Sequence, residues 1–221
     1  MAITVEEIWF IRNEALHHKG SVDLQAARLR INAKFSEYCR VFSLLKAPSP
    51  EKSDAKWSPP PVGTIKLNVD AALSHSNAVL AVIARDNMGA VVKVWSKIIP
   101  LCPPLLAETE AILWALHLAL GENWRNIIVE SDSKFSIDAI LDRADNTRWS
   151  ISALVSDING FANSFSSCSF FWINRSGNAA AHAFAKYALA CFSSFCLLPG
   201  SLPADLASVC LEDALALSVS S

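Results

Sequence analysis

The order of strand-like and helix-like runs between residues 64 and 190 constrains the fold of this chain most. Three runs of strand type come first, at 65–70, 79–84 and 90–96, the last two joined by the turn-forming residues RDNMG. Helices and strands then alternate, with helices expected over 105–120, 134–141, 149–162 and 178–189 and strands over 126–132 and 167–173. This order predicts an α/β domain with a five-stranded mixed sheet and helices on both faces.

A proline-rich segment divides the chain. Residues 47–63 contain five prolines, at positions 48, 50, 59, 60 and 61. Because proline fixes φ and lacks a backbone donor, we expect an extended linker there, with a domain boundary near Gly63. The linker separates an amphipathic, helical N-terminal extension over 1–46 from the domain at 64–190. Residues 191–221 form a C-terminal tail, in which Leu202, Leu206 and Leu211 suggest a last short helix packed on the domain.

The composition limits the classes of protein to which this chain can belong. Hydrophobic residues make up 52% and charged residues 18% of the 221, enough apolar surface for a folded core. The net charge of −2 gives no strongly basic field, so charge alone does not predict tight non-specific binding of nucleic acid. The six cysteines lack the paired spacing of a zinc site. The late apolar stretch at 188–198 is far shorter than the ~20 residues of a membrane span, and no basic-then-apolar leader opens the sequence. We expect a reduced, intracellular protein that does not enter a membrane.

Three carboxylates carry the functional prediction. Asp70 and Asp132 each end a strand-like run, and Glu108 lies near the start of the helix at 105–120. Open α/β sheets place their chemistry at the carboxyl edge of the strands. Three acids that converge there repel one another unless cations lie between them, so the pattern predicts a divalent-metal site for phosphoryl chemistry.

Each acid taken alone has another explanation. Glu108 shares a helix face with Ala111, Ile112 and Ala115, where an unpaired carboxylate is costly, so either a metal or a buried base is expected beside it. Asp70 lies on the polar side of a half-buried strand, so a solvent-facing position is equally expected. Asp132 has the alternative role of N-cap for the helix that follows. The order strand-Asp, helix-Glu, strand-Asp is what favours the metal site.

Five stretches in order carry a family resemblance: WSPPPVGTIKLNVDAA, VIARDNMG, LLAETEAILWAL, IIVESDS and NRSGNAAAHAFAKYA. Over residues 57–189 the chain resembles ribonuclease H domains, most closely those of the plant retroelement (reverse transcriptase-like) type. The segment IWFIRNEAL in the N-terminal extension also resembles what precedes this domain in plant retroelement proteins.

The resemblance implies a metal-dependent endonuclease that hydrolyses the RNA strand of RNA–DNA hybrids with two Mg²⁺ ions. One ion would lower the pKa of the attacking water and the other would stabilise the departing oxygen. By motif, Asp70 would bridge both ions, with Glu108 and Asp132 each on one side. The hybrid, or another nucleic acid, would be the partner, read through shape and 2′-hydroxyl groups.

Several positions depart from the family pattern. His182 stands where the family often has a fourth aspartate; it is either a fourth ligand or a partly exposed helix residue. Ala71 and Ala81 replace expected glycines, and alanine would be strained there if φ were positive. Trp172 stands where a histidine is frequent. Since imidazole favours softer ions than Mg²⁺, we expect reduced activity, with Mn²⁺ as the alternative ion.

Two other classes of function remain open at this level. The departures at Ala71, Ala81 and His182 favour a catalytically weak or inactive nucleic-acid-binding remnant of a retroelement protein, whereas the three intact acids favour the nuclease. A purely structural α/β domain also fits the composition, but it leaves the position of Glu108 on an apolar helix face unexplained.

Overall fold

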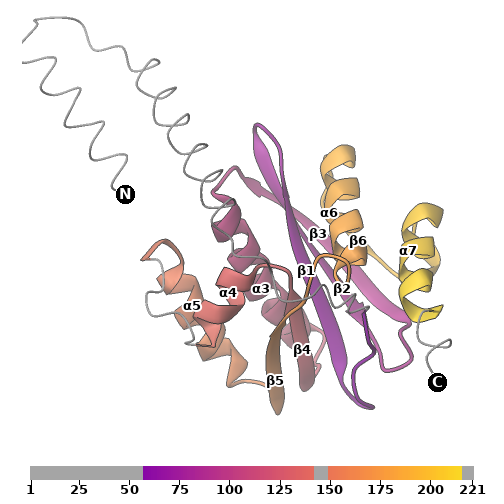
Figure 1. The fold of residues 1–221 in the computed structure, drawn as a ribbon, viewed down its shortest axis with the longest axis horizontal. Coiled ribbons are helices and arrows are strands. Elements are labelled where there is room, and N and C mark those ends of the chain that lie inside the picture. Colours follow the sequence, from indigo (N-terminus) through magenta and orange to yellow (C-terminus); the bar gives the residue numbers. More distant parts are fainter. Residues whose placement is uncertain (1–56, 142–148, 216–221) are drawn as a thin grey trace, which may run out of the picture. The chain divides into compact units, whose positions relative to one another are not determined.

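A computed structural model describes residues 57–141 and 149–215, with side chains to residue 211. The expected N-terminal extension and most of the linker lie outside the described residues. The described part forms a six-stranded mixed sheet in the order β5-β4-β1-β2-β3-β6, flanked by helices (Figure 1).

The first three strands form an antiparallel meander: β1 (Ile65–Leu73), β2 (Asn77–Arg85) and β3 (Val91–Pro100). Strand β4 (Asn126–Ser131) runs parallel to β1, and β5 (Ser167–Trp172) runs parallel to β4. These are the five predicted strands. The sixth, β6 (Phe195–Leu197), pairs antiparallel with β3 and lies in the segment expected to be a tail, so the predicted count of five is one too low.

The helices cover both faces of the sheet, as predicted (Figure 1). Helices α3 (Pro104–Gly121), α4 (Lys134–Ile140) and α5 (Trp149–Ala162) lie on one face. Helices α6 (Ala179–Cys191) and α7 (Ala204–Leu215) lie on the other, with a short 3-10 turn, η1 (Pro199–Ser201), between β6 and α7. None of the described helices is both long and apolar enough to cross a membrane.

Each helical layer has its own hydrophobic core. Alternate side chains of β1 and β2, such as Leu67 and Leu80, join Ile112 of α3 in the larger core. The opposite face joins Ile83 to Phe184 in the smaller one. This smaller core takes in part of the C-terminal segment, because Leu206 of α7 is buried there and Leu202 packs against it. Leu211 is exposed instead.

The polar side of β1 is not exposed to solvent, contrary to the prediction of a half-buried strand. Lys66 and Asn68 alternate with apolar residues as expected, but both are buried. Neighbouring strands supply their partners. Lys66 Nζ lies 2.5 Å from Glu130 Oε1 of β4, and Asn68 Nδ2 donates to Glu130 Oε2 at 2.9 Å. Each charge therefore enters the interior with a partner, which offsets much of the cost of burial.

Trp57 covers this buried polar cluster. Its Nε1 donates to Asn68 Oδ1 at 2.9 Å, and its ring lies 3.7 Å from the guanidinium carbon of Arg85. Arg85 Nη2 donates to the same Asn68 oxygen at 2.9 Å. Lys66 Nζ also donates to the backbone oxygen of Ser58 at 2.7 Å. The first described residues of the expected linker thus pack against β1, while the boundary near Gly63 itself stays a prediction.

Candidate metal centre

The register of two parallel strands brings Asp70 and Asp132 together. The last pair between β1 and β4 is Val69 with Ser131, and each aspartate is the next residue of its chain segment. Asp70 lies within β1 and not at its end, since β1 continues to Leu73 against β2. Asp132 directly follows the end of β4. The two carboxylates therefore meet at the carboxyl edge of β4, where open α/β sheets place functional groups.

Glu108 joins them from the first half of α3. One carboxylate oxygen each from Asp70, Glu108 and Asp132 lies within 4.8 Å of the other two. Three segments that are far apart in the sequence thus each place one carboxylate oxygen in the same small region. The alternative of a solvent-facing Asp70 is wrong, because its side chain is fully buried.

Two of these carboxylate oxygens have no hydrogen bond within the described part of the chain. They are Asp70 Oδ1 and Glu108 Oε2, and both are buried. A buried polar atom without a partner is costly and indicates a missing water or ion. Because hard divalent cations prefer oxygen ligands, the group fits a metal ion of the Mg²⁺ or Mn²⁺ type.

Burial dominates the electrostatics of the site. It raises the pKa of Glu108 to about 9, and the negative charges of Asp70 and Asp132 add to this rise. Arg175 and the hydrogen-bonded backbone N–H of Ala71 act in the opposite direction on the pKa of Glu108. Burial also raises the pKa of Asp70, against the hydrogen bond from His182. Without a cation the raised pKa favours the protonated form of Glu108 at neutral pH, and a divalent ion would favour its ionised form.

His182 of α6 lies at the edge of this group. Its Nδ1 is 2.9 Å from Asp70 Oδ2, in a hydrogen bond whose direction depends on the tautomer. The mutually close ligand atoms belong to the three carboxylates, and His182 reaches them through Asp70. The structure thus places all four predicted site residues in one region, with the three acids as its centre.

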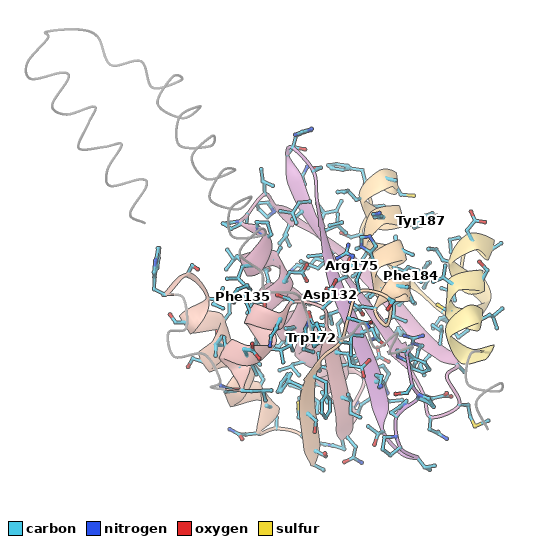
Figure 2. All side chains as sticks on the ribbon, in the orientation of Figure 1. Asp132, Phe135, Trp172, Arg175, Phe184 and Tyr187 are labelled. Atoms are coloured by element: carbon cyan, nitrogen blue, oxygen red, sulfur yellow. The ribbon has the colours of Figure 1, made fainter. Side chains whose placement is uncertain are left out.

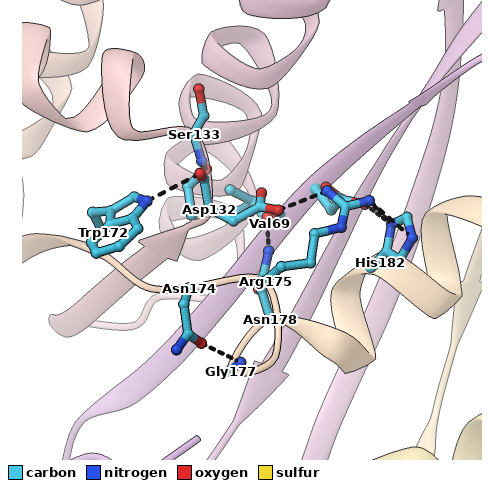
Figure 3. Close-up of polar contacts among 11 residues, drawn as sticks. Val69, Asp132, Ser133, Trp172, Asn174, Arg175, Gly177, Asn178 and His182 are labelled. Carbon is cyan, nitrogen blue, oxygen red and sulfur yellow. Dashed lines mark hydrogen bonds and ion pairs between the residues drawn. The ribbon is translucent and has the colours of Figure 1, made fainter. Parts of the chain in front are cut away.

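Sequence reasoning missed Arg175, which lies in the loop between β5 and α6. Its Nη1 donates to Asp132 Oδ2 at 2.7 Å, and its Nη2 lies 2.6 Å from Nδ1 and 2.9 Å from Nε2 of His182 (Figure 3). The only signal in the sequence was a lone positive charge in the segment NRSGN. Figure 2 labels Arg175 close to Asp132, in agreement with their hydrogen bond.

The loop that carries Arg175 is fixed at both ends. Buried Asn178 donates from Nδ2 to the backbone oxygen of Val69 at 2.8 Å, which ties the start of α6 to β1 (Figure 3). Asn174 Oδ1 accepts the backbone N–H of Gly177 at 2.8 Å. On the other side, Trp172 Nε1 donates to the backbone oxygen of Asp132 at 3.1 Å. The backbone around the site is therefore held by hydrogen bonds.

Three hydroxyl groups join the segments that carry Glu108 and Asp132. Thr109 Oγ1 lies 3.0 Å from Ser136 Oγ, which in turn lies 2.7 Å from Ser133 Oγ. Ser133 occupies the N-cap position of α4, without a side-chain capping bond. Asp132 is therefore not the N-cap residue, and its carboxylate faces the other acids.

The alanines that replace expected glycines are not strained. Among the described non-glycine residues, only Asn123 and Phe192 have a positive φ. Ala71 and Ala81 lie within β1 and β2 in ordinary strand geometry, and Ala81 pairs directly with Asp70. The strain argument for reduced activity therefore does not apply to these two positions. Two other departures contact the site: His182 lies beside Asp70, and Trp172 donates to the backbone of Asp132.

The described part of the chain has the ribonuclease H-like fold, with a group of three acids at the carboxyl edge of β4. Residues 68–188 match the reverse transcriptase-like family, and the chain belongs to that family. No curated protein matches the sequence.

Solved structures agree on the fold. RNase H1 from the halophilic archaeon Halobacterium salinarum is 19% identical, with a TM-score of 0.55, over 57% of this chain and 98% of that one. LC11-RNase H1, isolated from compost by a metagenomic approach, is 20% identical, with a TM-score of 0.53, over 60% of this chain and 100% of that one. The structure of LC11-RNase H1 in complex with an RNA/DNA hybrid gives 20% identity and a TM-score of 0.52, over 58% and 99% of the two chains.

Proposed function

We propose that this chain is a metal-dependent endonuclease that hydrolyses the RNA strand of RNA–DNA hybrids. The observation that carries the proposal is the group of three carboxylates with two buried oxygens that lack hydrogen bonds. Its place at the carboxyl edge of β4, in a domain of the reverse transcriptase-like family with the RNase H fold, supports the same function.

The proposed roles follow from position. Asp70, Glu108 and Asp132 would hold divalent cations, and His182 would contribute at the edge through Asp70. Bound cations would supply an activated water and stabilise the departing oxygen. The chain's own part is to hold these oxygens together at a buried edge. We propose Mg²⁺ as the ion, with Mn²⁺ as the alternative because of the imidazole of His182.

The test is cleavage of a hybrid with a labelled RNA strand in Mg²⁺ and in Mn²⁺. The variants are Asp132→Asn and, as a matched control, Asp138→Asn, which removes a carboxylate on α4 that pairs with Lys134 at 3.3 Å. We expect cleavage by the wild type and by the control, and none by Asp132→Asn or in the presence of a chelator. Cleavage that survives Asp132→Asn would refute the proposed site.

A second candidate is a nucleic-acid-binding protein with little or no hydrolysis. His182 favours it, because imidazole adds no negative charge where the resembling family often has an aspartate. Hybrid binding without cleavage in either metal would support this candidate. The variant His182→Asp then distinguishes a weakened nuclease, in which it increases cleavage, from a chain that only binds.

A further inference from the structure

The guanidinium of Arg175 contacts the same carboxylates that would hold metal ions. Nη1 donates to Asp132 Oδ2 at 2.7 Å (Figure 3). It also lies 3.9 Å from Asp70 Oδ1, the buried oxygen without a hydrogen bond. Its other nitrogen, Nη2, contacts His182. One positive group therefore contacts three of the four residues of the candidate site.

Arginine is suited to this position because its planar guanidinium holds several N–H donors in a fixed fork. Its two terminal nitrogens contact two residues at once, Nη1 contacting Asp132 and Nη2 contacting His182. Lys134 is the next basic residue along the chain from Asp132, but it pairs with Asp138 and lies 5.9 Å from the ring of Trp172. Among the described arginine and lysine side chains, Arg175 is the one that pairs with Asp70 and Asp132.

The side chain of Arg175 is exposed enough to move away from Asp132. It is 58% exposed, whereas the side chains of Asp132 and Asp70 are 10% and 0% exposed. The hydrogen bonds of its loop run through Asn174, Gly177 and Asn178 and hold the backbone. Displacement of the guanidinium therefore needs a rotation of one side chain, with the loop in place.

We propose that Arg175 is an internal counter-cation that competes with divalent ions for Asp132 and thereby sets the metal affinity of the site. The inference rests on the metal-binding part of the proposed function. An ion bound at Asp132 Oδ2 takes the position to which Nη1 now donates, so binding requires that the contact break. Removal of the guanidinium frees the oxygen and removes a like charge that repels the ion.

The test is isothermal titration calorimetry at constant ionic strength. Protein freed of metal with a chelator is titrated with MnCl₂ and, separately, with MgCl₂. Arg175→Ala is compared with wild type, and Lys134→Ala is the control, because it removes a nearby positive charge that does not contact the site. We expect Arg175→Ala to bind the ions about fivefold more tightly, the factor that corresponds to an exposed ion pair at the upper end of its usual strength. Arg175→Lys should fall between Arg175→Ala and wild type.

Unchanged or weaker binding by Arg175→Ala would overturn the inference, and so would an equal gain from Lys134→Ala, which would indicate a general charge effect. Absence of binding in both wild type and Arg175→Ala would overturn it as well. A parallel cleavage assay separates the two proposals. A shift in affinity without any hybrid cleavage contradicts the proposed nuclease alone, whereas cleavage with an affinity independent of Arg175 contradicts this inference alone.

Discussion

The raised pKa of Glu108 predicts an unusual effect of the variant Glu108→Gln on metal-free protein. The pKa of Glu108 is about 9 in the folded state against an ordinary value of 4.5. As the pH rises from 4.5, the unfolded chain releases this proton while the folded chain keeps it. Ionisation therefore stabilises the unfolded state, and the free energy of unfolding of the wild type falls up to about pH 9.

The size of the effect at a given pH below about 9 follows from how far that pH lies above the ordinary pKa of 4.5. At pH 7 this distance is about 2.5 units, so ionisation of the carboxyl group stabilises the unfolded state by about 3 kcal/mol, at 1.36 kcal/mol per unit. Glutamine resembles the protonated acid and does not ionise in either state. Glu108→Gln is therefore expected to be more stable than wild type by up to about 3 kcal/mol at pH 7 and nearly equal to it at pH 4.5. Asp70, whose pKa is also raised, is present in both proteins and cancels in the comparison.

The assay is urea denaturation in the presence of a chelator at several pH values between 4.5 and 8. Glu110→Gln is the matched control, since Glu110 is on the same helix but pairs with Lys97 at 3.8 Å outside the site. A difference between wild type and Glu108→Gln that does not grow with pH would refute the reasoning. Addition of Mg²⁺ should reverse the order, because the ion binds the ionised carboxylate of the wild type.

Three further predictions concern residues outside the acidic group. Trp57→Ala should lower the free energy of unfolding by about 3–5 kcal/mol, because it removes a buried ring that contacts Arg85; a loss under about 1 kcal/mol in denaturation would contradict this packing. Glu130→Gln should cost about 3–5 kcal/mol, since buried Lys66 loses its carboxylate, and unchanged stability would show that the pair does not stabilise the fold. Burial raises the pKa of the Cys168 thiol to about 12, so Cys168 should react with iodoacetamide at pH 8 far more slowly than exposed Cys196; equal rates would contradict this difference.

Most of the fold follows from local sequence patterns. The alternation in IKLNVD and the helical spacing in LLAETEAILWAL are local signals, and both elements form where expected. Strand β6 has only three residues and depends on its pairing with β3 nearly a hundred residues away, so no local pattern indicates it. The same limit applies to the polar side of β1, because its partners Arg85 and Glu130 come from other strands.

The candidate site, like the fold, was predictable from the sequence only in part. The convergence of Asp70, Glu108 and Asp132 was predictable because each lies at a defined place on a regular element. Arg175 lies in a loop without periodicity, so its contact with Asp132 depends on how β5 and α6 are placed in three dimensions. Whether Ala71 is strained depends on its φ angle, which sequence alone does not give; its φ is not positive, so the condition for strain is not met.

Hydrolysis of a hybrid labelled on both strands tests the central claim most directly. With wild-type protein in Mg²⁺, and again in Mn²⁺, the account predicts fragments of the RNA strand, an intact DNA strand, and no fragments with Asp132→Asn. An intact RNA strand in both metals, with hybrid bound to the protein, would contradict the nuclease, and cleavage of both strands would contradict the proposed specificity for RNA.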